Sequence, residues 1–186
     1  MSNLTDDLKN ALSSVVSGAG DVAGTVQRVA KENVVNLIQG AGGVAAAGFQ
    51  TIDQVVTEGL QTISSTGISL TEGVSGLVRG VVEGAKDAGV NVTEAAGEAA
   101  SQAVKTAASV GGDVGTVAIS SVQGAIQAAG DVGADSGELA KSAVSGILKA
   151  ADEVGSEVGG TVRKALLNAA ALPHDIIDAF LTGKTE

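Results

Sequence analysis

The sequence contains no cysteine, no tryptophan and no tyrosine, and its 186 residues include one proline and one histidine. Without cysteine the chain can form neither disulfide bonds nor thiolate metal sites. Its only aromatic residues are two phenylalanines, so it lacks the side chains that usually bury the largest area in a core. Any core must therefore be built from many shallow contacts between Val, Ile, Leu and Ala.

Positive charge is also scarce. Lys and Arg number 11 against 21 Asp and Glu, which gives a net charge of −10. Nucleic acid is not expected as a partner, because binding phosphates requires clustered cations, and electrostatic attachment to anionic lipid is disfavoured. The hydrophobic fraction of 44% is too high for a simply disordered chain. The first residues lack a basic and apolar signal sequence, so we expect a cytoplasmic protein or one peripherally attached to a membrane.

Motifs for catalysis or cofactor binding are missing. His174 has no second histidine or cysteine with which to form a metal site, and a repetitive helix offers no pocket for Ser–His–acid chemistry. The glycine clusters at 18–20 and 40–43 lack the preceding strand and the Lys-Ser/Thr ending of a phosphate-binding loop. We therefore predict a protein that is not an enzyme, with no catalytic residue, no bound cofactor and no metal.

What the sequence does contain is a repeat of 22 residues. The stretch VQGAIQAAGDVG at 122–133 returns as VSGILKAADEVG at 144–155, and a related stretch stands at 78–89. Within each unit the apolar places recur after 11 residues, which is three turns of a helix at 3.67 residues per turn. This hendecad period predicts an all-α fold. We expect a cap over 1–11, repeat units over 12–172 that begin at 12, 34, 56, 78, 100, 122 and 144, and a C-terminal short helix and tail over 173–186.

Glycine follows the same period, and two explanations compete for it. In the first, long continuous helices associate with copies of themselves into a bundle or tube, and the glycines mark places where backbones come close. We favour it because the hendecad phase holds within each unit. The predicted self-association residues are Gly67, Gly89, Gly111, Gly133, Gly155, Val78, Val122, Val144, Ile126 and Leu148.

In the second explanation the column of glycines from Gly67 to Gly155 marks helix ends. A potential N-cap follows two residues after each of them, and several fit the capping-box pattern. The candidate caps are Ser69, Asn91, Asp113, Asp135 and Glu157. The chain would then form an up-down bundle of helices of roughly 18 residues joined by glycine turns.

Two segments depart from the repeat. The stretch 33–52 carries no charge, and we consider a membrane span, contact with lipid, or burial against protein, of which burial is favoured. Its candidate lipid-contact residues are Val34, Leu37, Ile38, Val44 and Phe49. At the other end Pro173 must end the repeat helix, and a short amphipathic element follows that either caps the fold or docks a protein partner. Its candidate residues are Ile176, Ile177, Phe180 and Leu181.

From Leu12 to about Ala170 the pattern resembles the amphipathic repeats of exchangeable apolipoproteins, perilipin-like droplet coats and bacterial phasins. That resemblance implies a coat on a lipid surface or granule. In size and Ala/Gly-rich composition the chain also resembles the small stalk subunit of actinobacterial high-affinity hydrogenases, which implies a membrane-associated helical tube that gathers enzyme protomers. Our leading hypothesis is a non-enzymatic, self-associating scaffold or stalk that organises a partner complex, and the alternative is the coat protein.

Overall fold

The computed structural model describes residues 4–16, 20–42 and 45–182, and the elements found there are all α-helices. This confirms the all-α class. The helices are α1 (Leu4–Val16), α2 (Val22–Gly40), α3 (Ala45–Thr66), α4 (Leu70–Asp87), α5 (Val92–Ser109), α6 (Val114–Val132), α7 (Ser136–Val154), α8 (Ser156–Asn168) and α9 (His174–Thr182).

The helices end at the periodic glycines. Gly89 and Gly111 follow α4 and α5 with positive φ angles of 79° and 71°, which a residue without a Cβ adopts at no steric cost. At Gly89 the amide of Val90 donates to the carbonyl of Ala85 at 2.8 Å, and the Gly89 amide donates to the carbonyl of Lys86 at 3.0 Å. This pair of hydrogen bonds is a Schellman motif, which satisfies the last carbonyls of a helix and reverses the chain.

The helices begin at the polar residues that follow these glycines. Asn91 Oδ1 accepts the backbone amides of Thr93 and Glu94, and Asp135 Oδ1 accepts the amide of Glu138 at 2.9 Å. Ser69 and Asp113 cap α4 and α6 in the same way. The predicted caps are therefore confirmed at these four positions. The expectation for Glu157 is wrong, because α8 already begins at Ser156 and Gly155, its N-cap residue, has no side chain to cap it.

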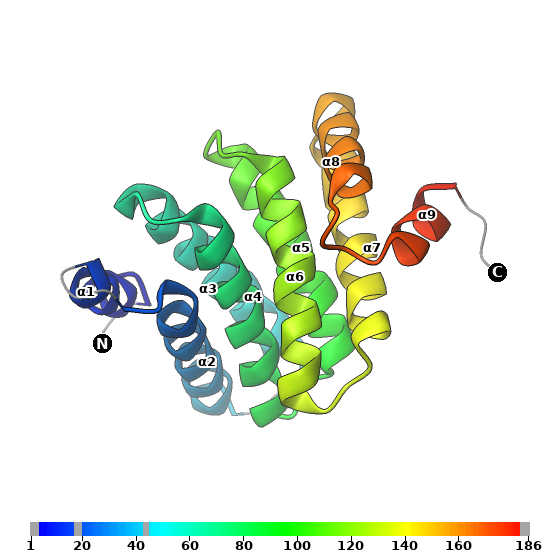
Figure 1. Cartoon of the computed structure of the whole chain (residues 1–186). Coiled ribbons are helices and arrows are strands. Elements are labelled where there is room, and N and C mark those ends of the chain that lie inside the picture. The colour runs from blue at the N-terminus through cyan, green and yellow to red at the C-terminus, as the bar shows by residue number, and fades with distance from the viewer. Residues whose placement is uncertain (1–3, 17–19, 43–44, 183–186) are drawn as a thin grey trace.

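Because each turn reverses the chain, helices two apart in sequence are parallel neighbours. Helices α2, α4, α6 and α8 form one layer, and α1, α3, α5 and α7 form the other, with α9 against the ends of α7 and α8. In Figure 1 the even-numbered layer lies toward the viewer, and the helices converge at the lower edge and spread at the upper edge. This two-layer stack of hairpins is the architecture of helical repeat proteins.

A second set of glycines lets parallel neighbours in one layer approach closely. Gly76, Gly80 and Gly84 of α4 lie on one stripe against α2, and a Cβ built on Gly80 would fall within 3.0 Å of the Gln27 backbone. Gly124 brings α6 onto the backbone of α4 at Ser75, and Gly146 brings α7 onto α5 at Gly97. The core between the layers is filled by Val, Ala, Leu and Ile that are almost all fully buried. Small residues thus replace the missing aromatic side chains by shortening the distance between helices.

The favoured expectation of long continuous helices is wrong, because the chain breaks at the column that includes Gly67 and Gly133. The competing expectation of shorter helices joined by glycine turns agrees with the structure, in which α4 and α5 each contain 18 residues. The predicted close approach at glycines also occurs, but at the column of Gly80, Gly124 and Gly146, and between helices of a single chain. The 22-residue period does not distinguish long helices from short ones. A continuous helix keeps it as two hendecads, and a short helix together with its turn also fills one unit.

The uncharged stretch 33–52 is likewise divided between two helices, α2 and α3. Its first part ends α2 at Gly40, and its last part begins α3 after the positive-φ residue Gly42. Among the described residues, none of the helices is both long enough and apolar enough to cross a membrane. The favoured interpretation, burial against protein, describes the inward face of this stretch, where Val34, Ile38 and Ile52 are buried.

Candidate functional site

The residues predicted for self-association fall into two groups in the structure. Gly67, Gly89, Gly111 and Gly133 lie in turns, and a Cβ built on any of them, or on Gly155, would meet no atom within 4 Å. They are turn residues and not contact points between backbones of this chain, and their contact with a second copy stays a prediction. The apolar members do pack, but inside one chain. The core holds Val78, Val122 and Val144 fully buried, with Ile126 and Leu148 partly buried against it.

The residues predicted for lipid contact are mostly turned inward. Val34 and Ile38 of α2 are buried, while Leu37 beside them is 38% exposed. Val44 lies outside the described residues, and Phe49 of α3 is half-buried against the core. At these positions the apolar face of α2 meets α4, so contact of Val34 or Ile38 with lipid would require the helices to separate.

The C-terminal element is used mainly to close the fold. Ile176 and Ile177 of α9 are buried in the core, and Leu181 packs partly against it. The Phe180 side chain lies outside the described part of the structure. α9 begins directly after Pro173, whose carbonyl accepts the amides of Ile176 and Ile177. These contacts favour the expectation that the element caps the fold over the expectation that it docks a partner. His174, at the start of α9, is exposed.

A groove of about 800 Å³ lies on the outer face of the odd-numbered layer, between α5 and α7. Its lining includes the close approach of Gly97 and Gly146, and the Ser142 hydroxyl beside it donates to the Thr93 carbonyl at 2.6 Å. Phe49 of α3 borders it. The remaining lining residues are Glu94, Glu98, Ser101, Lys105, Glu138, Lys141, Ser145 and Lys149.

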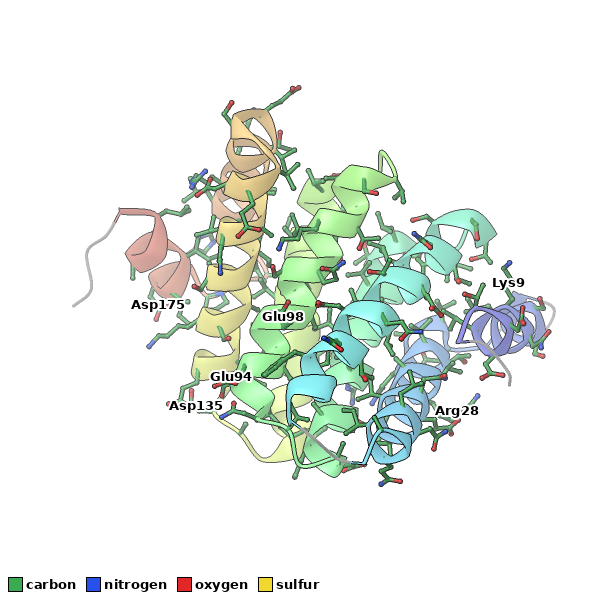
Figure 2. All side chains as sticks on the ribbon, turned by 180° about the vertical axis from the view of Figure 1, so that it is seen from behind. Lys9, Arg28, Glu94, Glu98, Asp135 and Asp175 are labelled. Carbon is green, nitrogen blue, oxygen red and sulfur yellow. The ribbon has the colours of Figure 1, made fainter. Side chains whose placement is uncertain are left out.

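Charges of both signs face this groove. On α5, Glu94 and Glu98 lie one turn apart, and Figure 2 shows both on the outer face of the odd-numbered layer. On α7, Lys141 and Lys149 lie about two turns apart on one side of the helix. Neither lysine has an ion-pair partner in the described part of the chain. The α7 wall therefore presents two lysines that form no ion pair with a described residue, beside a carboxylate of its own, Glu138, and opposite the carboxylates of α5.

Lys105, at the far end of the groove, already forms an ion pair. Its ammonium lies 2.8 Å from the Glu153 carboxylate, and this hydrogen bond raises the pKa of Lys105 and lowers the pKa of Glu153. The pair joins α5 to α7 and closes that end of the groove.

The even-numbered layer carries charges that are satisfied among themselves. Arg79 of α4 donates two hydrogen bonds to the Asp131 carboxylate of α6, and Lys31 of α2 lies 3.0 Å from Asp87. Glu83, which is 9% exposed, accepts a hydrogen bond from Gln27, and its burial raises its pKa. This network joins three parallel helices and leaves little charge for a ligand, which makes it a structural feature.

The described residues contain no group of three or more His, Asp or Glu that could hold a metal ion. The groove contains serine hydroxyls but lacks a histidine, because His174 lies on α9 and is not part of its lining.

No protein-family model matches the chain, and no curated protein matches it.

The groove was not predicted from the sequence. The whole of α6 separates its two walls along the chain, and their alignment depends on the register between α5 and α7. The lysine spacing on α7 and the acidic spacing on α5 are visible in the sequence, but each resembles an ordinary solvated helix face. The one predicted residue that does reach the groove is Phe49.

Proposed function

We propose that this protein is a non-enzymatic helical scaffold that binds a helical segment of a partner protein in the groove between α5 and α7. The observation that carries the proposal is the groove itself, whose α7 wall presents Lys141 and Lys149 without ion-pair partners among the described residues. From Thr93 to Lys105 its α5 wall extends for about 18 Å at 1.5 Å per residue, which accommodates about three turns of a helix. A surface channel between two parallel helices receives the side-chain ridge of a third.

The charges define the chemistry of the partner segment. Its side facing α7 would carry acidic residues seven or eight positions apart, to meet Lys141 and Lys149, and its side facing α5 would carry basic residues. An apolar residue near one end would pack against Phe49. Such opposed charges fix the orientation of a partner more than they add affinity.

The experiment compares tagged wild-type chain with the charge-reversed double variant Lys141→Glu/Lys149→Glu after purification from its native cells. The matched control is Lys164→Glu, an exposed lysine on α8 outside the groove. Mass spectrometry should identify a protein that co-purifies with the wild type and the control and is lost with the double variant. If the same proteins are recovered with all three chains, the groove is not the binding site.

Self-association is the other proposed property of the scaffold, and it requires a surface different from the one first expected. Val78, Val122 and Val144 are buried within one chain and cannot serve a second copy as well. Static light scattering over a concentration series tests the property. A constant monomer mass at micromolar concentration would remove self-association from the proposal and leave partner binding.

The alternative, a coat on a lipid surface or granule, receives less support because the apolar faces of the helices are turned toward each other. A coat would need the two layers to open so that these faces could enter the acyl boundary. Flotation with neutral vesicles distinguishes the two functions. Recovery of the chain with the vesicles would favour the coat, and its absence from the floating fraction would favour the scaffold.

A further inference from the structure

Helices α3 and α5 are joined by a short run of polar contacts. The Gln102 amide donates to the Thr57 hydroxyl at 2.9 Å, and the hydroxyls of Thr57 and Thr106 lie 3.4 Å apart. These two helices are parallel, so their register continues unchanged along the contact. One turn earlier on each helix, four residues before Thr57 and four before Gln102, stand Asp53 and Glu98. The register therefore places two carboxyl groups opposite each other at this contact.

Within the part of the chain that the structure describes, no cation is paired with the carboxylates of Asp53 and Glu98 to balance their two negative charges. Its Oδ1 atom is buried and has no hydrogen-bond partner. The charged groups that act on Asp53 are Glu98 and Lys105, both on α5, and Lys105 is engaged by Glu153 of α7. Helices α1, α2 and α4 also pack against α3, and within the described residues they place no charged group with a resolved effect on Asp53. A half-buried carboxylate beside another one, with no cation paired to either, is unfavourable, and the repulsion is relieved when one of the two takes up a proton.

We propose that Asp53 and Glu98 share one proton, and that this proton joins α3 to α5 under mildly acidic conditions and is released near neutral pH. With the proton present, one carboxyl donates a hydrogen bond to the other carboxylate across the helix contact. Without it, two carboxylates repel each other at the same place. Because Phe49 lies one turn before Asp53, the pair controls how firmly the α3 border of the groove is held. The inference does not depend on whether the groove binds a partner.

The direction of the effect on stability follows from linkage. Burial, together with the hydrogen bond and the charge of Glu98, raises the pKa of Asp53 from 3.8 to about 6. Between these values the folded chain binds more protons than the unfolded chain, so stability must fall as pH rises from about 4 to 6 and then level off. A shift of this size corresponds to at most about a hundredfold change in the unfolding equilibrium constant. Because Asp53 is only partly buried, we expect a change of roughly tenfold.

Two measurements test the proposal. In the first, the carboxyl carbon of Asp53 is followed by NMR in uniformly labelled protein from pH 3 to 8, with Asp53→Asn used to assign the signal. We expect a midpoint near 6, and a lower midpoint in Glu98→Gln. A midpoint near 4 in the wild type would overturn the proposal.

In the second, urea unfolding is measured at pH 4.5 and pH 7.5 for the wild type, Asp53→Asn and Glu98→Gln. Asp53→Asn removes the titrating group, so this variant should lose the roughly tenfold rise in the unfolding equilibrium constant between pH 4.5 and 7.5. Glu98→Gln removes the repulsion but leaves the burial of Asp53, so it should lose part of that rise. The control is Glu58→Gln on the same helix, whose carboxylate accepts a hydrogen bond from Gln54 of α3. If all four proteins show the same dependence on pH, Asp53 and Glu98 do not share a proton.

Discussion

A single kind of substitution, glycine to alanine, distinguishes the two roles of glycine in this fold. At Gly80 the added methyl group would fall within 3.0 Å of three backbone atoms of Gln27. At Gly160 of α8 it would meet no atom within 4 Å, in the interior of a helix. At Gly111 it would also meet no atom, but it would be attached to a residue with a φ of 71°. The same chemical change should therefore have three different effects.

The magnitudes follow from the surroundings. Alanine in place of a glycine inside a helix gains about 1 kcal/mol of helix propensity. At Gly80 this gain is opposed by overpacking against backbone, which cannot rotate away, and which costs roughly 3 kcal/mol at the upper end of the usual range. We expect a net loss of about 2 kcal/mol for Gly80→Ala. Gly160→Ala should gain up to about 1 kcal/mol. Gly111→Ala should lose about 1 to 2 kcal/mol because an L-residue is strained in the left-handed region.

Urea unfolding followed by circular dichroism at 222 nm measures all three variants against the wild type. With a slope of about 2 kcal/mol per molar urea, the midpoint should fall by about 1 M for Gly80→Ala and rise by up to about 0.5 M for Gly160→Ala. A Gly80→Ala variant as stable as the wild type would show that α4 and α2 are not in backbone contact. A Gly111→Ala variant with increased stability would restore the explanation of a continuous helix.

Three further predictions use the same assay. Asp135→Ala should lose about 1 kcal/mol because it removes the N-cap of α7, whereas Ser156→Ala, at the uncapped start of α8, should change stability by less than about 0.5 kcal/mol. Arg79→Gln should cost about 1 kcal/mol at pH 7, since its bidentate pair with Asp131 is two-thirds buried. The Arg79 guanidinium lowers the pKa of Asp131 below 3.8, so the cost should be present above that pH and fade as the pH falls below it. Ile177→Ala should lose about 2 to 3 kcal/mol, and an unchanged stability would mean that α9 does not belong to the cooperative fold.

The class of fold could be predicted because helical periodicity is a local property. Apolar residues three and four apart indicate a helix whether or not the helix continues, and this signal is present throughout the repeat. The ends of the helices were harder to predict than their presence. Ser69 and Asn91 have the right spacing from the preceding glycines, but a glycine that recurs once in every repeat unit is equally compatible with a contact between long helices. The decisive property, a positive φ, is not written in the sequence.

The groove and the Asp53–Glu98 pair could not be predicted from the sequence. Both depend on which turn of one helix faces which turn of another, and Asp53 and Glu98 are separated by α4. The contact at Gly97 sets the register of α5 against α7, and the contact at Thr57 sets that of α3 against α5. A single sequence gives the spacing within each helix, but it does not give the offset between them.

The alternation of the layers has a consequence for how such a chain can change in length. Neighbouring units belong to opposite layers, and those between Gly67 and Gly155 have the same length, as the even spacing of the turns at Gly67, Gly89 and Gly111 shows. Loss or duplication of one unit would send every later helix to the wrong side of the stack, with its apolar stripe facing solvent. Loss or duplication of two units together would return each helix to its own side. Natural variants of this protein should therefore differ in length by pairs of helices, and internal duplications should begin and end at every second glycine turn.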